Sequence, residues 1–148
     1  DITIRTTFIV GFPGETEEDF AELKDFVQQQ RFEDAGVFMY SQEDGTEAGR
    51  MENQIPEEIK ENRFHELKAI QSAISQEIYR EKEDKVMKAV IISQDEEEGL
   101  AYARSEHEAP DVDNPIYVEG AQGLQVGDFV NLRISQGFSN GMVAELEK

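Results

Sequence analysis

Residues 5–19 read RTTFIVGFPGETEED, and the transition within this stretch decides the first part of the fold. The residues up to Val10 are mostly β-branched and apolar, as in a buried strand. The Gly-Phe-Pro-Gly segment at 11–14 is typical of a tight turn. Thr16 is suited to cap a helix, because an acidic residue follows three positions later. The stretch therefore predicts a strand, a loop and a helix in this order.

A second strand is predicted after this helix. Residues 31–32 end the helix, and the apolar run at 35–40 follows. A strand–helix–strand unit makes a right-handed crossover between two parallel strands, and such strands normally belong to larger, covered sheets. Because only two strands are encoded and residue 1 is Asp rather than Met, we expect a C-terminal piece of a longer enzyme. The bare edges and faces predict self-association or poor order across residues 1–50.

One long helix is predicted from Pro56 to about Arg80, after a connector at 41–54 that shows no periodicity. Apolar residues recur every three or four positions and predict one buried face, made of Ile59, Phe64, Leu67, Ile70, Ile74 and Ile78. The opposite face is expected to be polar and exposed, and comprises Lys60, Glu61, Lys68, Gln71, Ser75, Glu81 and Lys82. We interpret this helix as a brace for the α/β part, which gives a first domain over residues 1–83.

From residue 84 onward the period changes to that of β-strands. Five short runs at regular spacing predict a small five-stranded antiparallel β-barrel over residues 84–148. The predicted strands are 86–92, 100–104, 116–119, 128–134 and 141–146. Glycines are expected at the turns, namely Gly120, Gly123, Gly127 and Gly137.

The composition excludes several kinds of chemistry. The 148 residues include no cysteine and 2 histidines, which excludes disulfides, thiolate metal sites and cysteine-held iron–sulfur clusters in this chain. His65 and His107 are interpreted as ordinary histidines, so no metal ligand is predicted. No apolar run approaches the roughly 20 residues that a membrane span requires, and we expect a soluble, cytoplasmic protein without membrane contact.

The charge favours a basic partner. The chain has a formal net charge of −19, and residues 84–148 alone contain thirteen acidic and five basic residues, a net charge of −8. This field repels nucleic acid and attracts basic proteins, although an acidic surface kept only for solubility is the alternative interpretation. The predicted partner-binding residues lie in one loop and are Glu106, Glu108, Asp111 and Asp113.

Two motifs resemble the last part of the radical S-adenosylmethionine domain of methylthiotransferases. They are TFIVGFPGET at 7–16, and VFMYS at 37–41 followed by DGT at 44–46 and by Ala48. Residues 103–113, ARSEHEAPDVD, are similar to the TRAM domain of the RimO branch of that family. The resemblance covers almost the entire chain, and it implies a fragment of a partial TIM-like barrel followed by a TRAM-like barrel.

The resemblance also implies a function. The RimO branch methylthiolates the β-carbon of an aspartate in a small-subunit ribosomal protein, which would be the basic partner. The full-length relatives use S-adenosylmethionine and two 4Fe–4S clusters. Because this chain has no cluster cysteines, we expect no bound cofactor, no catalytic residue and no activity in the chain alone. Two alternatives stay open, namely a fragment of a MiaB-type tRNA methylthiotransferase and a free-standing acidic interaction module.

Two loops are expected to form one wall of the S-adenosylmethionine pocket. Ligands of parallel α/β sheets bind beyond the carboxyl ends of the strands, where both loops begin. The glycines of the first loop would let the backbone approach a ligand, its proline would stiffen the turn, and its glutamate would accept hydrogen bonds from the cofactor. The second loop resembles the family's positions near the adenine. The predicted cofactor-binding residues are Gly11, Pro13, Gly14, Glu15, Tyr40 and Ser41.

Overall fold

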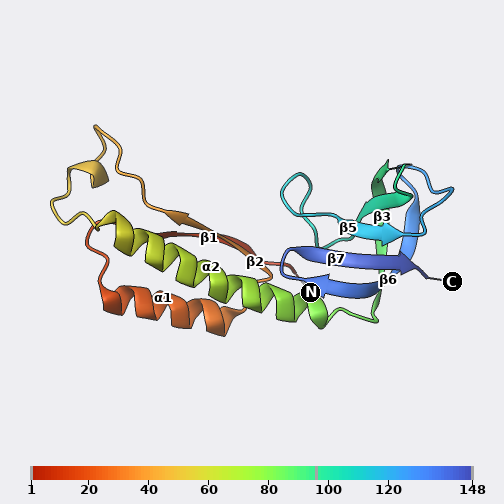
Figure 1. Cartoon of the computed structure of the whole chain (residues 1–148), viewed down its shortest axis with the longest axis horizontal. Coiled ribbons are helices and arrows are strands. Elements are labelled where there is room, and N and C mark those ends of the chain that lie inside the picture. The colour runs from red at the N-terminus through yellow and green to blue at the C-terminus, as the bar shows by residue number, and fades with distance from the viewer. Residues whose placement is uncertain (1, 96, 148) are drawn as a thin grey trace. The chain divides into compact units, whose positions relative to one another are not determined.

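The computed structural model describes residues 2–95 and 97–147 and divides into two compact units. One unit is Thr3–Ile74, and the other is formed mainly by residues 75–148. The elements follow in the order β1 (Arg5–Val10), α1 (Glu17–Gln30), β2 (Asp34–Met39), a 3-10 turn (Ala48–Arg50), α2 (Glu57–Arg80), β3 (Val86–Asp95), β4 (Leu100–Arg104), β5 (Ile116–Glu119), β6 (Phe129–Phe138) and β7 (Gly141–Leu146) (Figure 1). The predicted domain boundary between residues 83 and 84 stays a prediction. Within the described residues, no helix is both long enough and apolar enough to cross a bilayer.

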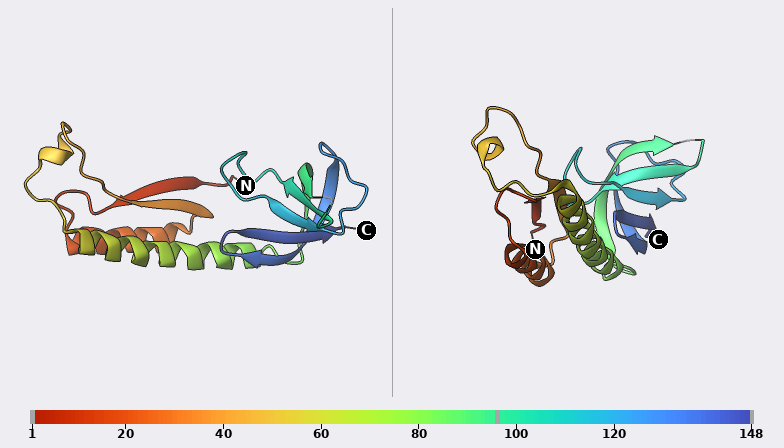
Figure 2. Two further views of the ribbon diagram at one scale, coloured as in Figure 1. Left: turned by 45° about the horizontal axis from the view of Figure 1, so that its top comes forward. Right: turned by 60° about the vertical axis from the view of Figure 1, so that its left-hand side comes forward.

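The two strands of the first unit are parallel, as predicted, with Phe8 opposite Val37. Both helices lie on one face of this strand pair (Figure 2). On that face the ring of Phe8 lies 6.4 Å from the ring of Phe26, between ring centres. On the other face Ile9 and Phe38 are cross-strand partners, and they are 57% and 59% exposed. In the described part of the chain, the strand pair therefore has one covered face and one open apolar face.

Helix α1 begins at the predicted cap. The Thr16 hydroxyl accepts a hydrogen bond from the Asp19 N–H, and the Asp19 carboxylate accepts one from the Thr16 N–H, at 3.1 and 2.8 Å. This capping box satisfies two backbone donors that the helix leaves unpaired. The hydrogen bonds from the backbone and side chain of Thr16 lower the pKa of Asp19. Arg31 ends the helix in the left-handed conformation, with φ 50°.

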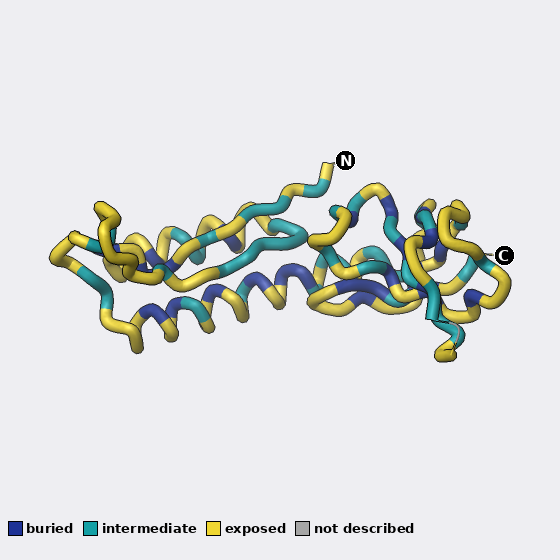
Figure 3. The backbone as a smooth tube through the Cα atoms, turned by 90° about the horizontal axis from the view of Figure 1, so that it is seen from above, coloured by how far each residue is buried: buried dark blue, intermediate teal, exposed yellow. Residues whose placement is uncertain are grey.

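Helix α2 is present as predicted, but the assignment of its faces is wrong at several positions. Lys60, Gln71 and Ser75 were expected to be exposed and are only 8%, 5% and 4% exposed, whereas Ile59 is 37% exposed. Figure 3 shows the buried positions repeating along this helix. Lys60 Nζ donates to the Tyr40 carbonyl, and Gln71 Nε2 donates to the Phe32 carbonyl. These side chains are buried because they pair with carbonyl groups at the two ends of β2.

The second unit contains the predicted five-stranded barrel, which is closed in the order β3-β4-β5-β7-β6. The expectation of a wholly antiparallel barrel is wrong, because β5 and β7 pair in parallel. The reason is the odd number of strands. Each of β4 to β7 runs opposite to the strand before it in the chain, so β5 and β7 run in the same direction, and they become neighbours because β6 pairs with β3 on its other side. The interior is filled by alanines, branched aliphatic residues and one methionine: Ala89, Ile91, Ala101, Ala103, Ile116, Val118, Ala121, Leu132, Ile134, Met142 and Ala144.

Gly137 lies within β6 rather than at the turn where it was expected. A Cβ atom at this position would lie 2.3 Å from the carbonyl carbon of Tyr79. The glycine therefore allows β6 to pass close to the last turn of α2, a packing reason that the sequence pattern does not show.

Candidate functional site

The structure brings the two predicted loop segments together at one edge of the first unit. Residues 11–15 follow β1 and residues 40–41 follow β2, and we call them the strand-end loops. The Tyr40 N–H donates to the Val10 carbonyl at 2.9 Å. The rings of Phe12 and Tyr40 meet edge to face, with their centres 5.4 Å apart. This is the juxtaposition that the parallel pairing predicts, and it places all six predicted cofactor-binding residues in two adjoining loops.

The first strand-end loop is a tight turn whose backbone N–H groups donate to acceptors within the chain. The Glu15 N–H donates to the Phe12 carbonyl at 3.0 Å, and Gly14 has φ +87°, as a Pro-Gly type II turn requires. The Gly14 N–H donates to the Asn53 carbonyl, and the Gly11 N–H donates to Glu15 Oε1. Because these donors have partners within the chain, the loop does not offer the row of free N–H groups that cradles a phosphate.

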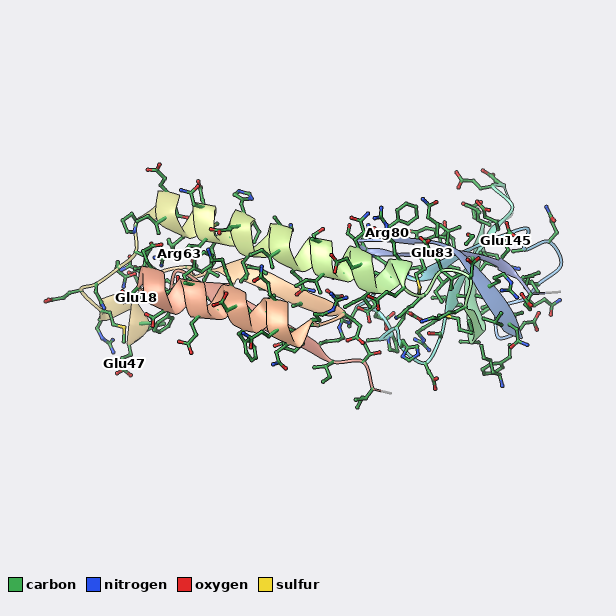
Figure 4. The ribbon with its side chains drawn as sticks, turned by 90° about the horizontal axis from the view of Figure 1, so that it is seen from below. Glu18, Glu47, Arg63, Arg80, Glu83 and Glu145 are labelled. Carbon is green, nitrogen blue, oxygen red and sulfur yellow. The ribbon has the colours of Figure 1, made fainter. Side chains whose placement is uncertain are left out.

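Glu15 is engaged within the protein. Its side chain is 12% exposed, and its Oε1 atom lies 3.0 Å from the Gly11 nitrogen and 2.6 Å from Arg63 Nη1. Arg63 Nη2 also pairs with Glu17 Oε1, at 2.5 Å. Figure 4 shows Arg63 on α2, near the start of α1. Burial acts to lower the pKa of Arg63, but the hydrogen bonds that its guanidinium donates to Glu17 and Glu15 outweigh this effect, and the pKa of Arg63 is raised. Arg63 is therefore a charged anchor for the loop.

Lys60 connects the two strand-end loops. Its Nζ atom lies 3.1 Å from the Tyr40 carbonyl oxygen and 2.6 Å from Glu57 Oε2. Its aliphatic stem occupies the space beside Gly11, where a Cβ atom would lie 2.2 Å from Lys60 Cγ. Gly11 also has φ +75°. Both the backbone conformation and the lysine stem therefore require glycine at this position.

Lys60 and Arg63 are not among the residues that the sequence pattern predicts for the site. Both lie in register with buried Leu67, because residues three or four positions apart share a helix face. This spacing is the one local signal of their burial, and it is weak because basic side chains are normally exposed.

The second strand-end loop offers one polar group that has no partner. The Tyr40 hydroxyl oxygen is buried, and it has no hydrogen-bond partner among the residues that the structure describes. A bound polar molecule is one way in which such a group is satisfied. Ser41 is exposed, and its hydroxyl donates to Glu43 Oε1 at 3.0 Å.

A metal cluster does not fit the residues present. Across 2–95 and 97–147, no group of three or more His, Asp or Glu side chains is arranged to hold a metal ion, and the sequence contains no cysteine. Iron–sulfur clusters are held mainly by thiolates. The ligands of any cluster would therefore have to come from outside this chain.

The four predicted partner-binding acids lie in the acidic loop, residues 105–113, which connects β4 and β5. Glu108 is 9% exposed, and its Oε2 atom accepts hydrogen bonds from the N–H and the hydroxyl of Ser105, at 2.7 and 2.6 Å. Asp113 Oδ2 accepts a hydrogen bond from the Ala109 N–H at 2.7 Å. These two acids fix the shape of the loop. Glu106 and Asp111 are exposed, and the Glu106 side chain retains 89% of its accessible surface.

Further acidic residues lie on the outer wall of the barrel. Glu119 and Glu145 are directly opposite each other on β5 and β7, and both are exposed. Glu145 also lies opposite Arg133 on β6. Arg133 forms a two-pronged ion pair with Glu147, at 2.8 and 2.7 Å, which raises the pKa of Arg133 and lowers the pKa of Glu147.

Comparison with known proteins confirms the resemblance. Residues 85–146 match the model of the TRAM domain. The chain is 39% identical over 142 residues to a protein of Clostridium botulinum named "Ribosomal protein uS12 methylthiotransferase RimO", covering 96% of this chain and 32% of that protein. Proteins with the same name from Pectobacterium atrosepticum and Thermoanaerobacter are each 43% identical, over 90% and 97% of this chain. The chain spans about a third of the length of these relatives.

Substituting Gly11 tests the packing of the first strand-end loop. We expect Gly11→Ala to lower the free energy of unfolding by about 3 kcal/mol, because alanine is strained at positive φ and its methyl group meets the Lys60 stem. The matched control is Gly45→Ala, which has φ +82° and nothing within 4 Å. The control isolates the backbone strain and should lose about 1 kcal/mol. Urea unfolding followed by circular dichroism measures both, and equal losses would contradict the contact between Gly11 and Lys60.

Proposed function

We propose that this chain belongs to the methylthiotransferase family of these relatives and that it is the C-terminal third of a radical S-adenosylmethionine enzyme that methylthiolates an aspartate of ribosomal protein uS12. The observation that carries this proposal is the extent of the similarity. An identity of 39–43% covers 90% or more of the chain, and so includes both the α/β unit and the barrel. If the similarity were limited to the TRAM domain, it would support a shared binding module but not a shared enzyme.

The α/β unit, in this proposal, is the end of a partial TIM-like barrel. Its two parallel strands pair only with each other among the described residues, and parallel sheets are normally covered on both faces. The open face with Ile9 and Phe38 would pack against further parts of the enzyme. In the isolated chain, the same apolar face would favour self-association.

The strand-end loops would form one wall of the S-adenosylmethionine pocket. The cofactor and the clusters supply the radical chemistry in the whole protein. Within this chain, Gly11, Pro13 and Gly14 shape the turn, and Glu15 holds it in place through its bonds to Gly11 and Arg63. The second loop presents the Tyr40 ring, whose hydroxyl has no hydrogen-bond partner within 2–95 and 97–147, and Ser41 beside it. The chain alone would be inactive, because it brings no cysteine for a cluster.

The barrel would dock the basic ribosomal protein, which implies a cytoplasmic enzyme. The exposed carboxylates of Glu106 and Asp111 and the opposed pair Glu119 and Glu145 support this role. Complementary charge speeds the encounter of two proteins and orients them. A nucleic acid is the poorer partner, because phosphate binding requires a basic surface.

The reaction itself is the first test. The longer protein that contains this chain, with its clusters reconstituted, is incubated with S-adenosylmethionine, a reductant and uS12. We expect tandem mass spectrometry to find one added methylthio group on an aspartate of uS12, while this chain alone modifies nothing. Modification of an adenosine in a parallel tRNA incubation, with unmodified uS12, would contradict the proposal and favour the MiaB-type alternative.

The docking role has a separate test on this chain. Replacing two outward acids, Glu106→Gln with Asp111→Asn, should weaken the binding of uS12 by about tenfold at low salt, because two attractive charges are removed. The difference should shrink at high salt, where exposed charges are screened. Fluorescence anisotropy of labelled uS12 measures both.

The control pair is Glu97→Gln with Glu98→Gln, which removes the same charge from the turn between β3 and β4. We expect this pair to weaken binding clearly less. Equal losses for both pairs would show that only net charge matters and would contradict docking through the acidic loop.

A further inference from the structure

Two basic residues of α2 are buried where charge is costly. Lys60 is 8% exposed and Arg63 is 5% exposed. Burying a charged group is unfavourable unless it is paired and hydrogen-bonded, so each of these side chains requires partners. Both find them in the strand-end loops or in the first turn of a neighbouring helix. Neither residue belongs to the motifs that carry the family resemblance.

We propose that Lys60 and Arg63 are positioning residues that fix the two strand-end loops relative to each other, an inference that rests on the proposed S-adenosylmethionine pocket. In this role they act through the loops and not by direct contact with the cofactor. Residues three positions apart lie on one face of a helix, so a single turn of α2 delivers both cations to the same edge. Helix α2 thereby fixes the separation of the two strand-end loops.

Arg63 holds the first strand-end loop through hydrogen bonds that share the Glu15 carboxylate. Its Nη1 atom donates to both the carboxylate and the carbonyl oxygen of Glu15, at 2.6 and 3.2 Å. The same carboxylate oxygen accepts the Gly11 N–H at 3.0 Å. The guanidinium therefore fixes the position of the Glu15 carboxylate, and this carboxylate fixes the Gly11 N–H at the start of the turn. Loss of Arg63 would leave a nearly buried carboxylate without its cation, which is strongly destabilising.

Lys60 connects this arrangement to the second loop. Its stem packs on Gly11, and its ammonium group donates to the carbonyl of Tyr40. The ammonium also lies 6.0 Å from the centre of the Tyr40 ring. One side chain thus contacts both loops, and the position of the Tyr40 ring depends on it.

The first arm of the test uses this chain and needs no cofactor. Arg63→Met keeps the length and the apolar stem of the side chain but removes its charge. We expect hydrogen exchange of the Gly11 amide to become about tenfold faster, because the carboxylate that accepts it loses its anchor. The matched control, Lys68→Met, removes a charge from an exposed position of the same helix and should leave this amide unchanged.

The second arm uses the longer protein and equilibrium dialysis with S-adenosylmethionine. Arg63→Met should weaken binding by about tenfold, Arg63→Lys should restore it only in part because lysine lacks the forked donors, and Lys68→Met should bind like the wild type. Normal binding and normal exchange in Arg63→Met would overturn the inference. If the wild-type protein itself does not bind S-adenosylmethionine, the proposed function fails, and the exchange result alone decides whether Arg63 positions the loop.

Discussion

The ion pair between Arg63 and Glu15 is the interaction on which the edge of the α/β unit formed by the strand-end loops depends. Both side chains are largely buried, so each must keep the other as its partner. Glu15 in turn fixes the backbone of the loop, because its carboxylate accepts a hydrogen bond from the Gly11 N–H. A loop that follows a strand would otherwise be free to change conformation. Here a charge pair with a long-range partner, 48 residues away in the sequence, holds it in one.

Helix α2 extends this constraint over the length of β2. Lys60 binds the carbonyl that follows the strand, and Gln71 binds the carbonyl of Phe32, just before the strand begins. A two-stranded sheet alone has little to hold it in shape. The polar contacts from helix α2 supply part of that support. They leave Ile9 and Phe38 on the open face exposed.

Periodicity was sufficient to predict both helices, the parallel strand pair and the five strands of the barrel, and Thr16 marked the start of α1. It failed where pairing partners are distant. Lys60 and Gln71 were assigned to the solvent because periodicity considers the residue type and not the carbonyl groups within reach. The parallel pairing of β5 with β7 follows from closure of the barrel, which no local pattern encodes. At the site, the sequence located the two loops, but the role of Arg63 as the partner of Glu15 required the three-dimensional arrangement.

A double-mutant cycle on Glu15 and Arg63 measures whether their pairing holds the loop. The free energy of unfolding of Glu15→Gln, of Arg63→Met and of the double variant is measured by urea unfolding, followed by the helical circular dichroism signal. We expect Arg63→Met to lose about 3 kcal/mol and the double variant to lose less than Arg63→Met alone, because the unpaired carboxylate is then gone. Additive losses would show that the two side chains act independently, and would contradict the claim that their pairing holds the loop.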